Sequence, residues 1–490
     1  MPPEASGERP ASLRLAALLL FGTALVPAGV SLATQRQPFT LGGLTDNWVY
    51  LGANLRVQGV LGEEAQPFTF RAPGYPLFVA GIFAAALERP PTVSYDYMVR
   101  GAEVVYAAQA LLLAGAGTIL FLWLASFVST TTAWAAGLVL ATSPQAIVLM
   151  GLVHYSVLHL FLLVAGGWAL HGFLAAEAPD ARRGFATGLL WGCVTLVRST
   201  TLILPAFALA LFLIRWRSWR RALAGLICFG AGMSLAIAPA TIRNYRVAHR
   251  LVPVNLQAGA VIWGSTVKVL PADPDSYHWF ELSDEFMRIF VRVTGQPLYD
   301  YPSFARHHVE MEDAMWSEAL ANLRRDPRPY LVNGLDAVRT LLLDTSSIMV
   351  RVFKFSQPPR PQIDQFWFRA SPPSDFLPVA PARGYARLGA VLTALAWFGV
   401  AAAALQKDAR ALVPAAVFAC MVAAHALTYM DLMYHYVRLP FVGFMAFYGL
   451  ERLARLAPAG RQPAALAAAR VVALLVAAAS LWLTAELLGA

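Results

Sequence analysis

The chain has 490 residues, of which 58% are hydrophobic and 14% are charged, with a mean hydropathy of +0.55. This composition excludes an ordinary water-soluble domain and predicts an all-α, multi-spanning membrane protein. The net charge of +9 does not indicate a nucleic-acid partner, because the arginines cluster in short loops between apolar runs, where they set the orientation of membrane helices.

Apolar runs of about 17 to 25 residues recur along the chain, and each can cross about 30 Å of hydrocarbon as a helix. About eleven spans are predicted, within a range of about ten to thirteen, at residues 12–34, 102–127, 131–150, 152–176, 184–199, 201–216, 221–241, 384–405, 411–429, 433–452 and 466–488. The first resembles a signal peptide, but no small-residue cleavage site follows it, so we expect an uncleaved helix. The apolar run 184–216 is too long for one crossing, and Arg198 at its middle predicts a hairpin of two helices.

Two further segments are expected at the membrane surface rather than across it. Residues 74–87 are too short to cross comfortably, and Pro73 and Pro76 break their start, which predicts a juxtamembrane or re-entrant helix. The stretch 330–355 carries charged residues at intervals that suit an interfacial amphipathic helix.

Charge in the short loops predicts which end of each helix lies in the cytoplasm. Under the positive-inside rule, the basic clusters belong inside, at residues 9–14, 182–183, 215–221, 407–410 and 452–461. Counting crossings from a cytoplasmic N-terminus then places the first loop (35–101), the region 243–383 and the turn Asp431–Arg438 on the same outer face. Polar side chains that are far apart in sequence can therefore meet there.

The loop at 45–76 carries the strongest candidate for chemistry, Asp46. An acidic residue just beyond a membrane helix and next to Trp48 and Tyr50 can have a raised pKa and accept a proton from a hydroxyl. Its alternative role is that of a helix N-cap. Arg71 in the same loop could hold a phosphate bidentately, or could snorkel to the membrane interface.

Two later outer segments also carry basic or aromatic groups. Arg243, Arg246 and Arg250 lie on the face where the positive-inside rule disfavours them, which indicates an anionic partner, either a lipid-linked phosphate or ordinary headgroups. The sequence DLMYHYVRLP puts four polar groups at the mouth of a span, where ionisable residues are functional by default, namely Asp431, His435, Tyr436 and Arg438. His435 is equally compatible with packing.

Other motifs are weaker or absent. The sequence has no GxxxxGK[ST], HExxH or CxxC pattern, so nucleotide hydrolysis and zinc proteolysis lack support. A cluster that could bind a metal but is expected to be solvated comprises His307, His308, Glu310 and Glu312. His154, Tyr155 and His159 lie at the turn between two spans, where they either line a cavity or pack.

Taken in order, these motifs resemble a family of membrane enzymes. The segments RAPGYPLF, PATIRNYRV, VPVN, LRRDPRPYL and YHYVRLP, together with Asp46, are similar to those of the polyprenyl-phosphate-dependent glycosyltransferases of the GT-C fold. The similarity is to glycosyltransferase family 39 and its bacterial relatives of the dolichyl-phosphate-mannose protein mannosyltransferase type, and it runs from about Asp46 to Pro440. It implies a transmembrane catalytic domain at 1–455, followed by a C-terminal transmembrane helix at 456–490.

The resemblance implies a role for each matching residue. Asp46 looks like the family's acidic residue in the first loop, the general base. The expected donor-phosphate and substrate-binding residues are Arg71, Tyr75, Arg243, Asn244, Tyr245, His435, Tyr436 and Arg438, and the candidate cavity residues are Tyr50, His154 and Tyr155. One departure is that family members carry Glu or Asp at the start of the fourth span, where this chain has Val157 or Leu158. The resemblance implies no particular cofactor and leaves open whether the site binds a divalent metal.

The function implied by this resemblance is transfer of a hexose or pentose from a polyprenyl-phosphate donor to an acceptor hydroxyl, with inversion. The acceptor would be a lipid, a glycan or a protein, and the active site would face the periplasm from the inner membrane. Residues 270–330 and 356–383, interpreted as long irregular segments, are expected to shape acceptor choice. The alternatives are a transporter or flippase for a lipid-linked saccharide and a non-catalytic polysaccharide-assembly protein. Transporters usually show internal repeats, and none is evident in this sequence.

Overall fold

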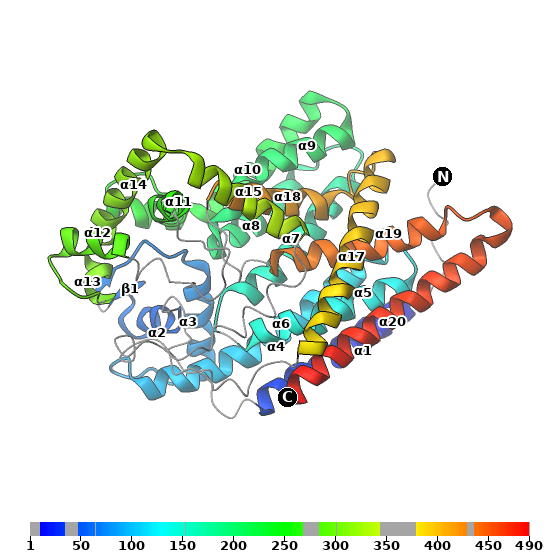
Figure 1. Ribbon diagram of the computed structural model, residues 1–490, viewed down its shortest axis with the longest axis horizontal. Helices are drawn as coiled ribbons and strands as arrows, with labels where there is room; N and C mark the ends of the chain where they lie inside the picture. The colour runs from blue at the N-terminus through cyan, green and yellow to red at the C-terminus, as the bar shows by residue number, and fades with distance from the viewer. Residues whose placement is uncertain are drawn as a thin grey trace.

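Figure 1 shows a computed structural model of the chain, which describes residues 10–34, 48–63, 65–151, 153–267, 284–299, 301–343, 379–428 and 436–489. The described residues form helices joined by loops, with one small antiparallel hairpin of β1 (Gly62–Glu63) and β2 (Gln66–Pro67). The all-α fold class that composition predicts is confirmed.

Seven helices in the described ranges are long and apolar enough to cross a membrane. They are α1 (Pro10–Thr34), α4 (Tyr95–Leu124), α7 (Ser156–Ala175), α9 (Leu204–Trp216) with the 3-10 turn η3 (Ser199–Ile203) before it, α10 (Trp219–Ala248), α17 (Val379–Leu405) and α20 (Gln462–Gly489), which follows the short turn η8 (Ala459–Arg461). The chain is therefore a multi-pass membrane protein, as predicted. Figure 1 shows α1 and α20 side by side along one edge of the bundle.

The other predicted spans correspond to shorter helices, which are α8 (Ala181–Val197), α18 (Val413–Ala426), α19 (Arg438–Ala454) and the pair α5 (Thr130–Thr142) and α6 (Pro144–Met150). The prediction of one continuous helix at 131–150 is wrong. Ser143 leaves the helical conformation (φ −62°, ψ 141°), because the residue before a proline disfavours it and Pro144 has no N–H with which to continue the ladder.

The predicted division of the run 184–216 into two helices is confirmed, whereas packing of the two helices against each other as a hairpin stays a prediction. Arg198 is extended (φ −151°, ψ 120°) and separates α8 from η3 and α9. Helix α8 then packs closely on α10 through glycines. A Cβ atom added at Gly188 would lie 1.9 Å from the carbonyl oxygen of Phe229, and one added at Gly232 would lie 2.1 Å from that of Phe185. The two backbones are therefore in direct contact, as small residues allow at membrane helix interfaces.

Two short helices match the segments expected at the membrane surface. Helix α3 (Gly74–Ala86) packs against α2 (Trp48–Gln58), α4 and α8, with Val79 and Phe83 buried. Helix α15 (Arg328–Leu343) covers the first part of the predicted interfacial helix 330–355, whose remainder lies outside the described residues. It packs across the end of α18, where the Tyr330 hydroxyl donates to the Leu427 carbonyl at 2.7 Å.

Four helices between α10 and α15 form a unit that we call the helical lobe. They are α11 (Ala258–Thr266), α12 (Asp284–Thr294), α13 (Tyr301–Arg306) and α14 (His308–Arg325). The lobe corrects the expectation that 270–330 is irregular, because α12 buries Phe286, Ile289 and Phe290 at helical spacing. Most of the second such segment, 356–383, falls outside the described residues. In Figure 1 the lobe lies at the left, beside β1, α2 and α3.

Candidate functional site

The loop after the β-hairpin is held by contacts from α10, the helical lobe and the segment between them. The Phe68 carbonyl accepts from Arg243 Nη2 at 3.1 Å, and the Phe70 carbonyl accepts from Asn255 Nδ2 at 3.1 Å. Between them, the Thr69 carbonyl accepts from the backbone N–H of residue 256 at 2.8 Å, and the Thr69 N–H donates to His308 Nε2 at 3.2 Å. Every residue of this three-residue stretch is therefore fixed through its backbone.

The side chains of the same stretch anchor it further. Phe68 and Phe70 are buried and lie against Phe304 of α13, with ring centroids 6.2 and 5.2 Å apart. Aromatic packing of this kind adds to the burial of apolar surface. Arg71 follows directly, so its backbone begins from a rigid point.

Arg71 lies over aromatic rings. Its guanidinium carbon is 5.2 Å from the centroid of Phe70 and 5.7 Å from that of Trp48, the first residue of α2. Trp48 in turn meets Tyr155 edge to face at 5.4 Å and Tyr75 at 5.8 Å. Cation–π contacts with desolvated rings stabilise a guanidinium by about 0.5–2 kcal/mol, so the ring cluster holds Arg71 in place.

A second arginine reaches the same ring cluster from α8. Arg198 is 8% exposed, its guanidinium carbon lies 5.3 Å from the Tyr155 ring centroid, and its Nη1 donates to the Tyr155 hydroxyl at 2.9 Å. The Trp48–Tyr155 pair therefore links Arg71 to Arg198. We call Arg71, Arg198, Trp48 and Tyr155 the arginine–ring cluster.

Gly74 permits this convergence. A Cβ atom there would lie 2.6 Å from backbone atoms of Leu196 and Val197, so only glycine allows the start of α3 to approach the end of α8 so closely. The approach brings the segment of Arg71 to the segment of Arg198.

The charges of both arginines act on the pKa of His154. It is buried between α6 and α7, and its Nδ1 lies 2.5 Å from the Ser156 hydroxyl. Burial first, and then the charges of Arg198 and Arg71, lower the pKa of His154 to about 3. The imidazole is therefore neutral at neutral pH, and the positive charge of the cluster resides on the arginines.

A polar network extends from Arg198 toward α18 and α19. Arg198 Nη1 lies 3.5 Å from the Tyr436 hydroxyl, and its Nη2 lies 3.4 Å from His425 Nε2. The Tyr436 hydroxyl also contacts His159 Nδ1 at 2.7 Å. Residues from four helices or their ends, α7, α8, α18 and α19, thus meet around one guanidinium.

The structure brings together four of the residues that the sequence predicts for the site, which are Arg71, His154, Tyr155 and Tyr436. Tyr75 is buried beside them and donates to Gln109 Oε1 at 2.8 Å. Tyr50 lies on α2, half-buried. Asp46 and His435 lie outside the described residues.

The other predicted site residues make different contacts. Asn244 is buried and donates to the backbone carbonyls of residues 252 and 254 at 3.1 and 2.8 Å, and Arg243 holds the Phe68 carbonyl. Tyr245 is 57% exposed. Arg438 is buried at the start of α19, where its Nη2 donates to the Thr393 hydroxyl at 2.5 Å. Arg243 therefore supports the loop that carries Arg71 directly, while Asn244 holds the segment before Asn255, which contacts the same loop.

Arg198 and His425 are absent from the residues that sequence motifs single out for the site, and His159 is named there only as a residue that either lines a cavity or packs. Arg198 carries a usable signal, because a charged residue within an apolar run is a functional candidate in itself. Because Arg198 lies in the middle of an apolar run too long for one crossing, the sequence pattern indicates a break between two helices there and not a site residue. The contact of His159 with Tyr436 joins residues far apart in sequence, which no local pattern reveals.

Two residues of the cluster at 307–312, His308 and Glu312, are buried, contrary to expectation, whereas His307 is half-buried and Glu310 is exposed. His308 Nε2 accepts from the Thr69 backbone, while its Nδ1 donates to the Ala305 carbonyl at 2.7 Å. The Glu312 carboxylate accepts from the N–H groups of Gly259 and Ala260 at 2.5 and 3.1 Å, which caps the start of α11. Across the described ranges, no group of three or more His, Cys, Asp or Glu side chains is arranged to hold a metal.

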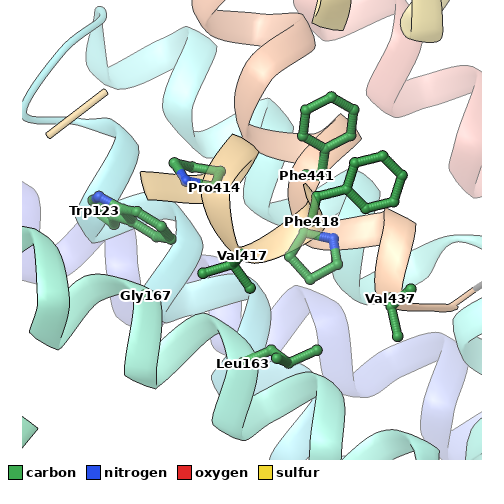
Figure 2. A pocket seen from close by; sticks show the side chains of 9 residues that line it. Trp123, Leu163, Gly167, Pro414, Val417, Phe418, Val437 and Phe441 are labelled. Atoms are coloured by element: carbon green, nitrogen blue, oxygen red, sulfur yellow. The ribbon is translucent and has the colours of Figure 1, made fainter. Parts of the chain in front are cut away.

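Figure 2 shows a small apolar cavity lined by residues of the same chain segments that carry His159 and Tyr436. Its volume of about 10 Å³ leaves room for about one water-sized molecule. Leu163 of its wall lies one turn after His159 on α7, and Val437 follows Tyr436 in the chain. The full lining is Trp123, Leu163, Gly167, Pro414, Val417, Phe418, Val437, Pro440 and Phe441. A cavity of this size does not hold an isoprenoid chain.

No protein-family model matches the sequence, and no curated protein matches it. Solved structures match its fold. The archaeal oligosaccharyltransferase AglB from Archaeoglobus fulgidus, in complex with an inhibitory peptide and a dolichol-phosphate, matches with a TM-score of 0.52 at 13% identity over 96% of this chain. This chain spans 55% of the length of AglB. ArnT from Cupriavidus metallidurans, bound to undecaprenyl phosphate, aligns with a TM-score of 0.39 at 15% identity over 90% of this chain and 79% of that chain.

The likeness to AglB establishes the architecture. AglB is a GT-C membrane protein, and the alignment covers nearly the whole of this chain. The chain therefore has the GT-C fold that its motifs predict.

Proposed function

We propose that this protein is a glycosyltransferase that moves a sugar from a polyprenyl-phosphate donor to an acceptor hydroxyl. The observation that carries the proposal is the arginine–ring cluster, in which Arg71 and Arg198 converge from separate parts of the chain. Guanidinium groups suit phosphate recognition because their planar fork matches two phosphate oxygens. The GT-C likeness to AglB, whose structure holds a dolichol-phosphate, supports a lipid-linked donor.

The chemistry fits a site without a nucleotide-binding motif. A sugar on a polyprenyl phosphate is already activated, so the protein must hold the phosphate, align the acceptor hydroxyl and remove its proton. The bond between the anomeric carbon and the phosphate oxygen breaks as the bond to the acceptor oxygen forms. The phosphate keeps the electron pair and leaves as polyprenyl phosphate, stabilised by Arg71 and Arg198 as its charge develops. One displacement inverts the anomeric carbon.

Asp46 is the proposed general base. It precedes Trp48 by two residues in the sequence, and Trp48 is the ring over which Arg71 lies. Two residues of chain reach at most about 7 Å, which supports a base near the arginine–ring cluster. The acceptor proton would pass to this carboxylate.

The remaining site residues divide into contacts with substrate and supports. Tyr155 and Tyr436 offer hydroxyls beside Arg198, and Arg438 and His435, on either side of Tyr436 in the sequence, complete that edge of the proposed site. Tyr50 and His154 are proposed to border it, and Tyr245 to meet the membrane or the acceptor from its exposed position. Tyr75, Arg243 and Asn244 are proposed to act through Trp48 and the loop at 68–70.

The proposed setting is the inner membrane, with the site on the periplasmic side. The distribution of arginines among the short loops supports this orientation under the positive-inside rule. The ordered motifs support a donor carrying one hexose or pentose, as in the protein mannosyltransferase type. The acceptor class is a lipid, a glycan or a protein.

The test is direct transfer by the full-length protein reconstituted in lipid. A labelled polyprenyl-phosphate sugar is supplied with candidate acceptors, and wild type is compared with Asp46→Asn, Arg71→Lys and Arg198→Lys. We expect Asp46→Asn to lower kcat by about 100-fold or more, as loss of a general base does. Both lysine variants should lose transfer because they lose the bidentate fork. Arg339→Lys, on the exposed face of α15, is the control and should match wild type.

Two outcomes would overturn parts of this proposal. Undiminished transfer by Asp46→Asn would refute the role of Asp46 as the general base. Absence of transfer by wild type with a panel of hexose and pentose donors would refute the proposed glycosyltransferase activity. It would favour a flippase for lipid-linked saccharides or a polysaccharide-assembly protein.

A further inference from the structure

His159 leaves one polar atom of the site network unexplained. The ring is fully buried in the first turns of α7, and its Nδ1 contacts the Tyr436 hydroxyl at 2.7 Å. Its Nε2 has no hydrogen-bond partner among the residues that the structure describes. More than about nine in ten buried polar groups in proteins are paired, so a buried ring nitrogen beside an arginine requires an explanation.

The direction of the hydrogen bonds assigns the proton on His159. Arg198 Nη1 can only donate, and it lies 3.5 Å from the Tyr436 oxygen, which therefore accepts. The hydroxyl proton of Tyr436 is then directed to His159 Nδ1, the closer neighbour. A neutral imidazole that accepts at Nδ1 carries its proton on Nε2. The unfilled atom of His159 is thus a donor.

The neighbourhood of this donor suits an oxyanion. Arg198 donates to Tyr155 and Tyr436, and its Nη2 lies 3.4 Å from His425 Nε2, so the network that contains His159 carries the positive charge of this guanidinium. A cation would be repelled by the Arg198 guanidinium, whereas a phosphate oxygen only accepts and carries the complementary charge. A trapped water is the competing occupant, because a buried water commonly fills an unpaired site.

We propose that His159 Nε2–H donates to a phosphate oxygen of the lipid-linked donor, so that His159 and Arg198 form one oxyanion subsite. Tyr436 is the positioning residue that fixes the tautomer of His159. This inference rests on the proposed function, since it names the atoms that hold the donor's phosphate. It also extends the phosphate site from the arginines to α7, at a residue for which the sequence leaves cavity lining and packing open.

Three substitutions separate the two ring nitrogens. His159→Asn keeps an acceptor near the position of Nδ1 for the Tyr436 hydroxyl but does not reach the position of Nε2. His159→Gln places its amide N–H₂ near the position of Nε2, and His159→Phe removes both nitrogens. The matched control is His171→Asn on the same helix, where the imidazole lies 5.2 Å from the Phe127 ring, away from Arg198.

Binding is measured without any sugar transfer. The full-length protein in lipid nanodiscs is titrated with radiolabelled undecaprenyl phosphate and, separately, with undecaprenol, which has the same tail and no phosphate. Wild type should prefer the phosphate. His159→Asn and His159→Phe should weaken binding of the phosphate by about 10-fold or more, the effect of one hydrogen bond to a charged group. Undecaprenol binding should not change, His159→Gln should stay within about 3-fold of wild type, and His171→Asn should match it.

Equal phosphate affinity of wild type and His159→Asn overturns the subsite and assigns Nε2 to water. A wild type that binds the phosphate no better than the alcohol overturns it as well. If His159→Asn does not fold, Tyr436→Phe supplies the test. Without the Tyr436 hydroxyl, the tautomer of His159 is no longer fixed, and phosphate binding should weaken by about 3-fold or more. An unchanged affinity again refutes the subsite. Phosphate binding that depends on His159 in a protein without transferase activity refutes the proposed function alone.

Discussion

Gly74→Ala tests whether the approach of α3 to α8 builds the site. The added Cβ would lie 2.6 Å from the Leu196 carbonyl carbon and from the Val197 nitrogen. Both are backbone atoms, so no side chain can turn aside to make room. The start of α3 must therefore move by roughly 0.8 Å to reach ordinary van der Waals contact, at a cost of about 1–3 kcal/mol.

This shift separates the two arginines of the arginine–ring cluster. Gly74 lies three residues after Arg71, and Val197 immediately precedes Arg198, so a displacement between them passes directly to the proposed phosphate site. Misplacement of reacting groups by about 1 Å can cost about 100-fold in rate. We therefore expect Gly74→Ala to lower kcat/KM for the lipid-linked donor by about 10- to 100-fold, together with a lower thermal stability.

The control is Gly81→Ala on the same helix. A Cβ at Gly81 meets nothing within 4 Å, and alanine is favoured over glycine in a helix by up to about 1 kcal/mol. Transfer kinetics and thermal unfolding in detergent are measured for both variants. Wild-type kinetics in a folded Gly74→Ala protein would refute the claim that this contact sets the distance between the arginines.

Two further predictions concern stability. Gly188→Ala should lower the unfolding temperature markedly, because its Cβ would lie 1.9 Å from the Phe229 carbonyl oxygen, whereas Gly230→Ala, with nothing within 4 Å, should be neutral in the same thermal unfolding assay. Burial lowers the pKa of His308 in the folded protein, so as the pH falls the unfolded chain binds a proton at this histidine before the folded protein does. The stability that neutral His308 contributes is therefore present above about pH 6.5 and is lost as the pH falls through the pKa of the folded state. When thermal unfolding is measured between pH 7.5 and 5, wild type should therefore lose stability more steeply than His308→Gln. Parallel curves would contradict the lowered pKa of His308. The comparison of the two proteins isolates the effect of His308 from that of Glu312, whose pKa is raised and whose contribution to the pH dependence has the opposite sign.

The helices are largely predictable because membrane-spanning segments are recognised in a sequence by their length and apolar composition. The break at Arg198 was predictable for the same reason, since an apolar run too long for one crossing must turn near its charged residue. The split at Ser143 was missed although Pro144 gives a local signal. The helical lobe was missed because its helices are amphipathic and short, and their apolar residues, such as Phe286 and Phe290, are diluted among charged ones.

The site was predictable only in outline. Motifs indicated Arg71, Tyr155 and Tyr436, but not that Arg198 would join them, because periodicity gives the face of each helix and not its neighbours around the bundle. The contacts of Arg243 and Asn244 were hidden for another reason. Their acceptors are backbone carbonyls, which every residue type possesses, so no sequence pattern marks them.

These backbone contacts change how the conspicuous arginine motif is understood. Arg243 lies against the expected distribution of charge, which first suggests a direct phosphate ligand. Its Nη2 instead holds the Phe68 carbonyl, while Asn255 holds that of Phe70 and His308 accepts from Thr69 between them. A stretch with all three residues tied in this way cannot shift independently of α10, the segment 249–257 and the lobe. The position of Arg71 over Trp48 therefore depends on a unit built from a distant part of the sequence, and changes in the lobe should reach the proposed phosphate site through this loop.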